Sequence, residues 1–285
     1  MASSALSETD DNSARSQWDA AADGWIEQAP QIHAWLSDAT AAMLDMAGVE
    51  PGMKVLDVAA GTGDQSCDIA CRVGPGGSVL ATDVSPRMLA AAAANLTAAG
   101  ISNAQTLLTE GETLGLDQAN FDAAVCRLGL MFFANPLAGL QAIRRALRPG
   151  GRFCTMVFSR PSANPCIGII VSIALRHMGL PASDPYLPGA LLSLGKPGLI
   201  EEHFRSTGFV DVEMKSVNAP FKLASVEEYL RFVCTAAGPV MIILDAMSPD
   251  TWQAARAEMV AALSVYATAD GWEAPTELLL VAGAR

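Results

Sequence analysis

The most constraining feature of the sequence is a stretch in which an apolar run ends in an acid and then turns through two glycines. Val55-Leu56-Asp57-Val58 is followed by Ala59-Ala60-Gly61-Thr62-Gly63, and a second apolar run over residues 78–82 ends in Asp83. This order predicts a buried parallel strand, a tight turn, a helix and a second strand. Backbone N–H groups of such a turn approach a ligand, and the second acid reaches two ribose hydroxyls. We therefore expect a nucleoside-bearing cofactor.

The same stretch excludes other cofactors. A dinucleotide fingerprint requires a third glycine, but Asp64-Gln65-Ser66 follows Gly63. Asp64 would also place a negative charge where a pyrophosphate has to lie, so an NAD-dependent dehydrogenase is excluded. A P-loop is excluded because no Gly-Lys-Ser/Thr ending follows. S-adenosylmethionine (SAM) fits, because it carries adenosine, a cationic sulfonium and an amino-acid tail but no phosphate.

Further motifs resemble those of class I SAM-dependent methyltransferases. Within that class the chain is similar to the type-11 family, which includes ubiquinone/menaquinone-biosynthesis C-methyltransferases. Besides the glycine turn, the matching segments are 83–89, 109–114, 121–130 and 147–152. Order and spacing agree across residues 50–160, and the likeness is looser from 160 to 285. The resemblance implies an α/β fold with a doubly wound, Rossmann-like, seven-stranded sheet that is mostly parallel and has an antiparallel last strand.

The hydrophobic pattern predicts one domain with three parts. Residues 1–48 hold a mobile tail and two helices between 17 and 48, residues 49–160 hold alternating strands and helices, and residues 161–285 add the remaining strands and helical insertions. The resemblance implies that the first part supplies a lid, that the second is the SAM-binding core, and that the insertions of the third cover the acceptor pocket. Alternating strands and helices with short turns are typical of a parallel sheet. The expected strands are 53–58, 78–82, 104–108, 121–126, 151–158, 208–214 and 276–284. The expected helices are 64–73, 86–99, 136–147, 166–178, 197–206, 226–233 and 251–266.

The resemblance also implies the residues that bind the cofactor. Asp57 would order the glycine loop and contact the methionine tail, and Asp83 would bind the ribose. Glu110 and Gly111 would lie near the adenine, and residues 18–25 resemble a lid helix that folds over SAM. Arg127 would lie at the pocket mouth, where a substrate carboxylate could bind, unless it is a surface arginine. The full expected set is Trp18, Trp25, Asp57, Ala59, Gly61, Thr62, Gly63, Asp83, Val84, Met88, Glu110, Gly111, Glu112 and Arg127.

The expected acceptor pocket is apolar and aromatic. Its predicted wall consists of Met131, Phe132, Phe133 and Phe158. The quinone-ring methyltransferases carry an Arg-Asn pair where this chain has Met131-Phe132, so a different acceptor is indicated. The Asn/Asp-Pro-Pro-aromatic motif of enzymes that methylate base or amide nitrogens does not follow the fourth strand either.

No catalytic base or metal site is indicated. The three histidines, His33, His177 and His203, match neither metal nor triad spacing. His177, beside the inserted helix, is the candidate base among them. The six cysteines show no Cys-x-x-Cys spacing, so we expect reduced, buried thiols rather than a metal centre.

The charge balance restricts the partners. The net charge of −12 opposes binding to nucleic-acid phosphates and to anionic membrane surfaces. The sequence shows no secretory leader, and its longest apolar run is shorter than a membrane span requires. We expect a cytoplasmic protein with a small-molecule partner; a homo-oligomer is left open.

Three functions are compatible with these motifs. The leading hypothesis is a SAM-dependent methyltransferase that transfers a methyl group by in-line displacement to a small, largely apolar or aromatic acceptor. The alternatives are a SAM-binding enzyme of the same fold that transfers no methyl group, and a non-catalytic protein that keeps the fold.

Overall fold

The main sheet confirms the predicted fold class. The computed structural model describes residues 13–116 and 119–285, and its seven-stranded sheet has the order β3-β2-β1-β4-β5-β10-β6. The pairs of β1 with β2 and β4, of β2 with β3, and of β4 with β5 are parallel. The last strand, β10, pairs antiparallel with both β5 and β6. The strands are β1 (Lys54–Val58), β2 (Ser78–Asp83), β3 (Ala104–Leu108), β4 (Phe121–Arg127), β5 (Leu147–Phe158), β6 (Val210–Asn218) and β10 (Glu277–Ala284).

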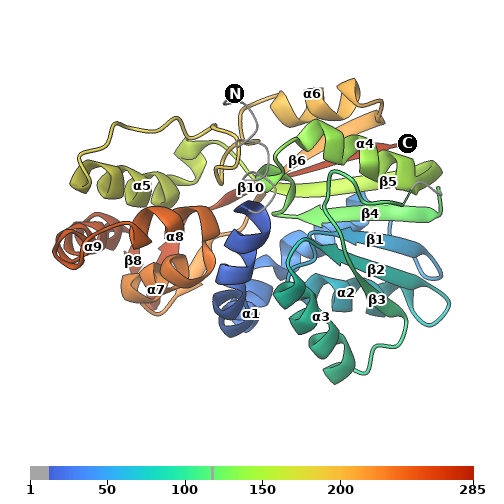
Figure 1. Cartoon of the computed structure of the whole chain (residues 1–285), viewed down its shortest axis with the longest axis horizontal. Coiled ribbons are helices and arrows are strands. Elements are labelled where there is room, and N and C mark those ends of the chain that lie inside the picture. The colour runs from blue at the N-terminus through green and yellow to red at the C-terminus, as the bar shows by residue number, and fades with distance from the viewer. Residues whose placement is uncertain (1–12, 117–118) are drawn as a thin grey trace, which may run out of the picture.

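Helices cover both faces of this sheet, which gives three layers (Figure 1). One face carries α1 (Ser13–Met46), α2 (Asp64–Val73) and α3 (Pro86–Ala98), and the other carries α4 (Pro136–Ala146) and α6 (Leu199–Ser206). Two of these helices begin as the sequence suggests. Pro86 and Pro136 occupy first helical positions, after the capping residues Ser85 and Asn135.

The prediction of two N-terminal helices is wrong, because α1 is a single 34-residue helix with Pro30 inside it. Pro30 is exposed, so the backbone bond that proline cannot donate is lost on the solvent side. One apolar face continues past it, and Ala22, Ile32 and Met43 are all fully buried. The first part of the predicted tail, residues 1–12, lies outside the described residues.

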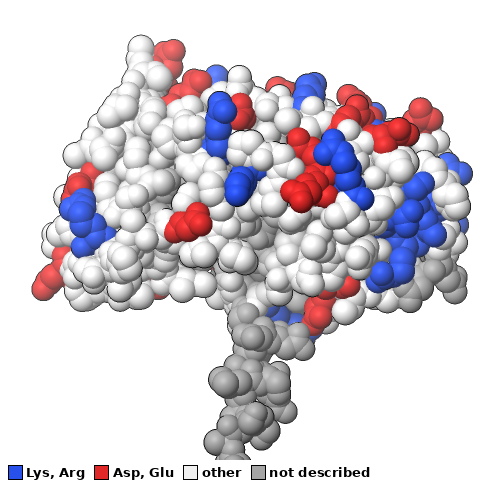
Figure 2. Space-filling model, turned by 90° about the horizontal axis from the view of Figure 1, so that it is seen from above, with Lys and Arg blue, Asp and Glu red and all other residues white. Residues whose placement is uncertain are grey.

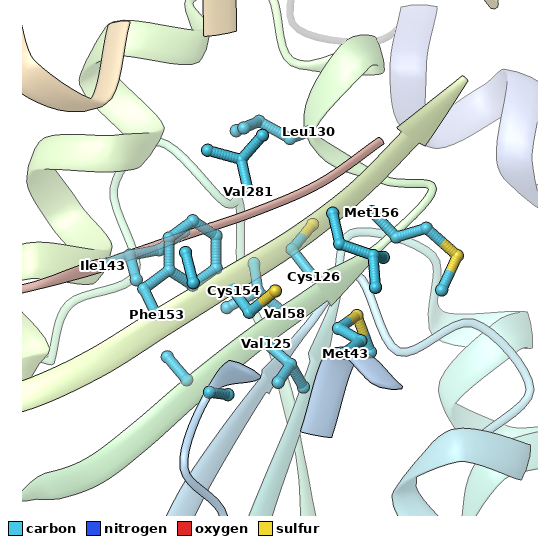
Figure 3. Packing of buried hydrophobic residues seen from close by; sticks show 14 of the residues in the cluster. Met43, Val58, Val125, Cys126, Leu130, Ile143, Phe153, Cys154, Met156 and Val281 are labelled. Atoms are coloured by element: carbon cyan, nitrogen blue, oxygen red, sulfur yellow. The ribbon is translucent and has the colours of Figure 1, made fainter. Parts of the chain in front are cut away.

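The core lies between the strands and these helices (Figure 3). Val125 and Cys154, on the neighbouring strands β4 and β5, lie close to Met43 of α1 in this view. Ile143 of α4 packs with Phe153 on the opposite face. Fully buried strands of this kind read as continuous apolar runs, which is why the sequence located them well.

A second hydrophobic core lies beside the sheet, and we call the elements around it the cap. In Figure 1 the long helix α1 stands between the cap and the main sheet. The cap comprises α5 (Pro165–His177), α7 (Val226–Ala236), α8 (Gly238–Asp245), α9 (Pro249–Leu263) and a small sheet of β7 (Phe221–Leu223), β8 (Ala267–Thr268) and β9 (Gly271–Ala274). The sequence did not predict α8 or this sheet, since strands of two to four residues show no periodicity.

The charged side chains are interspersed on the face shown in Figure 2. Basic and acidic groups lie side by side in several places, with wide uncharged areas between these clusters, and no basic surface extends across the whole face. Within the two described stretches, none of the helices combines the length and hydropathy needed to cross a membrane.

Candidate functional site

A cleft of about 540 Å³ opens where the strands β1, β2 and β4 end. The carboxyl ends of parallel strands are where ligands bind in open α/β sheets. The cleft brings together most of the residues that the sequence predicted for the cofactor. Those that line it are Trp18, Trp25, Ala59, Gly61, Asp83, Val84, Met88, Glu110, Gly111, Glu112 and Arg127.

Asp83 is held at the end of β2 with its carboxylate on the cleft. Its Oδ2 accepts the N–H of Gly61 at 2.9 Å, and its Oδ1 accepts the N–H of Ser85 at 2.9 Å. Burial raises the pKa of this carboxyl, and the backbone N–H groups oppose that rise. Each carboxylate oxygen has further acceptor capacity, so the fixed group can still bind hydroxyl donors of a ligand.

The two glycines of the turn are required for different reasons. Gly61 has φ 57°, a Cβ on it would meet no atom within 4 Å, and it lines the cleft. Gly63 has φ 79°, and a Cβ there would lie 2.8 Å from the Cβ of Ala92 in α3. Gly63 therefore permits α2 to approach α3. Three of the residues predicted for the cofactor do not line the cleft and lie behind its lining: Asp57, Thr62 and Gly63.

Asp57 is fully buried at the end of β1, where Gln65 and Ser66 donate hydrogen bonds to its two oxygens. Burial raises the pKa of Asp57 to about 7, although these hydrogen bonds and the Arg127 charge oppose the rise. Gln65 also lines the cleft, and its buried Oε1 has no hydrogen-bond partner among the described residues. At Gly61, which lines the cleft, a Cβ would stand in open space that a ligand can occupy, and Asp83 presents its carboxylate beside it. The lining therefore fits SAM.

Arg127 is not a surface arginine. Its Nη2 lies 2.6 and 2.7 Å from the two oxygens of Asp64, and its Nη1 donates to Thr40 at 3.0 Å. The pKa of Asp64 is lowered, because the Arg127 charge and hydrogen bonds outweigh the effect of burial. Asp64 thus stays ionised at the start of α2, in a buried pair with Arg127.

Two non-glycine residues adopt left-handed backbone where neighbouring strands end. Ala59 follows β1 with φ 54°, and Leu128 follows β4 with φ 54°. Both line the cleft. A Cβ on Gly129 would lie 2.5 Å from the Cβ of Ala59, so the two strand ends meet closely. Such strained positions cluster at functional sites.

The first half of α1 is fastened beside the cleft. Ser85 donates to Asp19, and Arg87 binds the Asp19 carbonyl at 2.9 Å and pairs with Asp23. The ring of Trp18 lies 4.9 Å from that of Phe132, between centroids. Trp18 and Trp25 of the segment predicted as a lid therefore line the cleft, and closure of this segment over SAM stays a prediction.

An apolar cavity of about 80 Å³ adjoins the cleft on the cap side. Trp18, Trp25, Leu128 and Phe132 line both spaces and so form a shared wall. In the described part of the chain, no Asp, Glu, His, Lys or Arg side chain lines this cavity. The rest of its wall includes Trp35, Met131, Phe158, Asn164, Cys166, Ile170, Phe221, Tyr229 and Phe232.

The predicted acceptor wall is only partly in this cavity. Met131 and Phe158 line the cavity alone, and Phe132 lies on the shared wall. Phe133 instead lines the cofactor cleft, because its ring occupies a notch between Gly111 and Gly139. A Cβ on these glycines would lie 2.0 and 2.4 Å from the ring.

The structure does not support His177 as a base. It lies near the end of α5 with its Nε2 2.9 Å from Glu258 of α9, and it lines neither space. Among residues 13–116 and 119–285, no three His, Cys, Asp or Glu side chains gather as metal ligands.

Several site residues escaped the sequence reasoning. Gln65 and Leu128 stand next to motif residues and could have been found by their position in the first turn of a helix and after a strand. Trp35, Tyr229 and Phe232 come from helices distant in sequence, and they carry no signal beyond apolar periodicity.

Comparisons with known proteins agree with this geometry. Residues 30–169 match the ubiE/COQ5 methyltransferase family. The ubiquinone/menaquinone biosynthesis C-methyltransferase UbiE of Ectopseudomonas mendocina is 34% identical over 125 residues, which are 44% of this chain and 48% of the relative. This chain thus spans about half the length of that relative. The nocamycin O-methyltransferase of Saccharothrix syringae is 27% identical over 234 residues, or 79% of this chain and 82% of the relative.

A solved structure shares the fold. Phosphoethanolamine N-methyltransferase 2 of Haemonchus contortus, solved in complex with S-adenosyl-L-methionine, superposes with a TM-score of 0.51 at 17% identity. The likeness covers 87% of this chain and 52% of that one. The family match over residues 30–169 contains most of the cleft, so the likeness to the ubiE/COQ5 methyltransferase family lies in the cofactor half of the chain.

Proposed function

We propose that this protein is a SAM-dependent methyltransferase acting on a small, largely apolar or aromatic acceptor. The observation that carries the proposal is that the cleft that holds the Asp83 carboxylate adjoins an apolar cavity, with four lining residues in common. In-line transfer requires the methyl group and the nucleophile to be in contact, so donor and acceptor would meet where the two spaces adjoin. Alignment of this kind can supply about 7–11 kcal/mol.

Different residues of the cleft would bind different parts of SAM. Asp83 would accept the ribose hydroxyls, and Met88 and Phe133 would pack near the adenine. The amino-acid tail would lie against the glycine turn, where Gly61 and Gln65 line the cleft. When bound, SAM supplies a methyl group already activated by its sulfonium. The chain therefore has to orient the acceptor and exclude water.

The cavity lacks a strong proton acceptor. Burial raises the pKa of Cys166 to about 12, and the pKa of Tyr229 is raised as well. An acceptor that is itself acidic, such as a phenol, an enol or a stabilised carbon acid, needs little help to lose its proton. A quinone-ring precursor is disfavoured, because Met131 and Phe132, which line the cavity, stand where the quinone-ring methyltransferases carry an Arg-Asn pair.

Labelled SAM tests the proposal. The chain is incubated with SAM tritiated in the methyl group and a panel of small apolar phenols, enols and isoprenoid-like carbon acids, and the label is followed into an organic extract. We expect label in the extract with the parent chain, and loss of it with Asp83→Ala. Met131→Ala should lower turnover while affinity for S-adenosylhomocysteine (SAH) stays within about twofold. Conversion of an acceptor without transfer of label would contradict methyl transfer and favour a SAM-binding enzyme that moves no methyl group.

A further inference from the structure

The apolar cavity has one buried hydroxyl that the protein itself does not use. Two buried side chains with oxygen atoms line it, Asn164 and Tyr229. The side chain of Asn164 already forms hydrogen bonds within the protein. Its Nδ2 donates to Ser159 Oγ at 3.2 Å and to the Glu277 carbonyl at 3.1 Å, and its Oδ1 accepts from the Glu277 N–H. The Tyr229 hydroxyl takes part in none of the hydrogen bonds formed within residues 13–116 and 119–285.

The open space beside Tyr229 is the cavity. The Tyr229 residue is only 7% exposed, yet its hydroxyl is not among the fully enclosed unpaired atoms, which in the described residues comprise Gln65 Oε1 alone. Tyr229 lines this cavity, so the cavity is the space from which a ligand atom would approach the hydroxyl.

The ring of Tyr229 is held in a fixed orientation. It stacks on Trp272 at 4.6 Å between centroids with an interplanar angle of 27°, and Phe221 meets it edge-on at 5.9 Å. Tyr229 belongs to the part of the cavity wall that the cofactor cleft does not share. The hydroxyl is therefore a rigid hydrogen-bonding group placed away from the methyl donor.

We infer that the Tyr229 hydroxyl binds an oxygen or nitrogen atom of the acceptor and so fixes which end of the acceptor faces the cofactor. This inference rests on the proposed function. It specifies the acceptor class further: an apolar body with a nucleophilic atom at the shared wall and a second polar atom opposite it. A phenol hydroxyl both donates and accepts, so a carbonyl, a hydroxyl or a ring nitrogen would satisfy it.

The test uses two ligands of equal shape that differ in one polar atom. 4-Chlorophenol and 4-chlorotoluene are titrated into the full chain saturated with SAH, and binding is followed by NMR shift changes. Tyr229→Phe removes the hydroxyl and keeps the ring. The matched control is Tyr266→Phe, since Tyr266 packs on the same Trp272 but lines neither space.

We expect Tyr229→Phe to weaken 4-chlorophenol binding about three- to tenfold, the range of one net hydrogen bond, and to leave 4-chlorotoluene within about twofold. Tyr266→Phe should change neither. The melting temperature of Tyr229→Phe should equal or exceed that of the parent, because no internal bond is lost. Equal effects on both ligands, or the same loss in Tyr266→Phe, would overturn the inference while leaving the acceptor cavity in place. Failure of both ligands to bind the parent chain would overturn the acceptor cavity itself, and unchanged SAH binding would then leave the cofactor site intact.

Discussion

Arg127, at the end of β4, holds Asp64, at the start of α2, through a two-point ion pair with N–O distances of 2.6 and 2.7 Å. Both side chains are largely buried, with 5% and 14% of their surface exposed. The pair fixes the first turn of α2 against the sheet edge that carries the cleft.

Asp64→Asn should therefore destabilise the protein by about 3 kcal/mol, because it leaves the Arg127 charge buried without its partner. Urea denaturation measures the change.

Asp68→Asn is the matched control one turn later. Asp68 is more exposed and pairs with His33 at 3.9 Å, so the loss of this acid should lower the free energy of unfolding by well under about 1 kcal/mol. The pKa of Asp64 is lowered, so the pair stabilises at neutral pH and its contribution is lost as the pH falls through that lowered value. Equal costs for the two variants would contradict this account.

Gly63→Ala should lower the free energy of unfolding by more than the strain of a left-handed backbone at an alanine. Gly63 and Gly74 flank α2 with φ of 79° and 65°, but of the two only a Cβ on Gly63 meets another residue, Ala92. We expect Gly63→Ala to be less stable than Gly74→Ala by about 1–3 kcal/mol, the usual cost of overpacking. Adding Ala92→Gly should recover part of that difference in thermal unfolding. If Ala92→Gly only adds to the loss, the contact between α2 and α3 is not the cause.

Asp57 should make stability fall as the pH rises from about 4 to 7. Its pKa is raised to about 7 by burial, so in this window the unfolded chain loses the proton that the folded chain still holds. The group therefore stabilises fully below its unfolded pKa, and this contribution declines by at most about 1.4 kcal/mol for each pH unit. Asp57→Asn has no such proton. The difference in unfolding free energy between the parent and Asp57→Asn should thus change steadily with pH, and a constant difference would show that Asp57 titrates normally.

The first half of α1 should respond to cofactor. Trp18 lines both spaces, and Asp19 joins the helix to Ser85 beside the Asp83 carboxylate. We expect SAH to slow backbone hydrogen exchange in residues 15–26, while exchange in α9, which lines neither space, stays the same. Equal exchange in residues 15–26 with and without SAH would contradict a lid.

The sequence predicted the cofactor half of this protein far better than the acceptor half, for physical reasons. The strand that ends in Asp57, the turn at Gly61 and the strand that ends in Asp83 are local patterns, each set by neighbouring residues. The acceptor cavity joins Met131, Trp35, Tyr229 and Phe232 from distant segments, and tertiary packing alone brings them together. Phe133 shows the limit most clearly: it stands next to Phe132, but the notch between two glycines turns its ring to the other space.

The most direct test of the central claim is calorimetric titration of SAH into the parent chain, Asp83→Ala and Asp68→Asn. Charge-assisted hydrogen bonds contribute about 1.5–3 kcal/mol each, so Asp83→Ala should weaken SAH binding about ten- to several-hundredfold. Asp68→Asn removes an acid outside the cleft and should bind as the parent does. Circular dichroism confirms that each variant is folded. A folded Asp83→Ala protein that binds SAH with the parent affinity would contradict the assignment of this cleft to SAM.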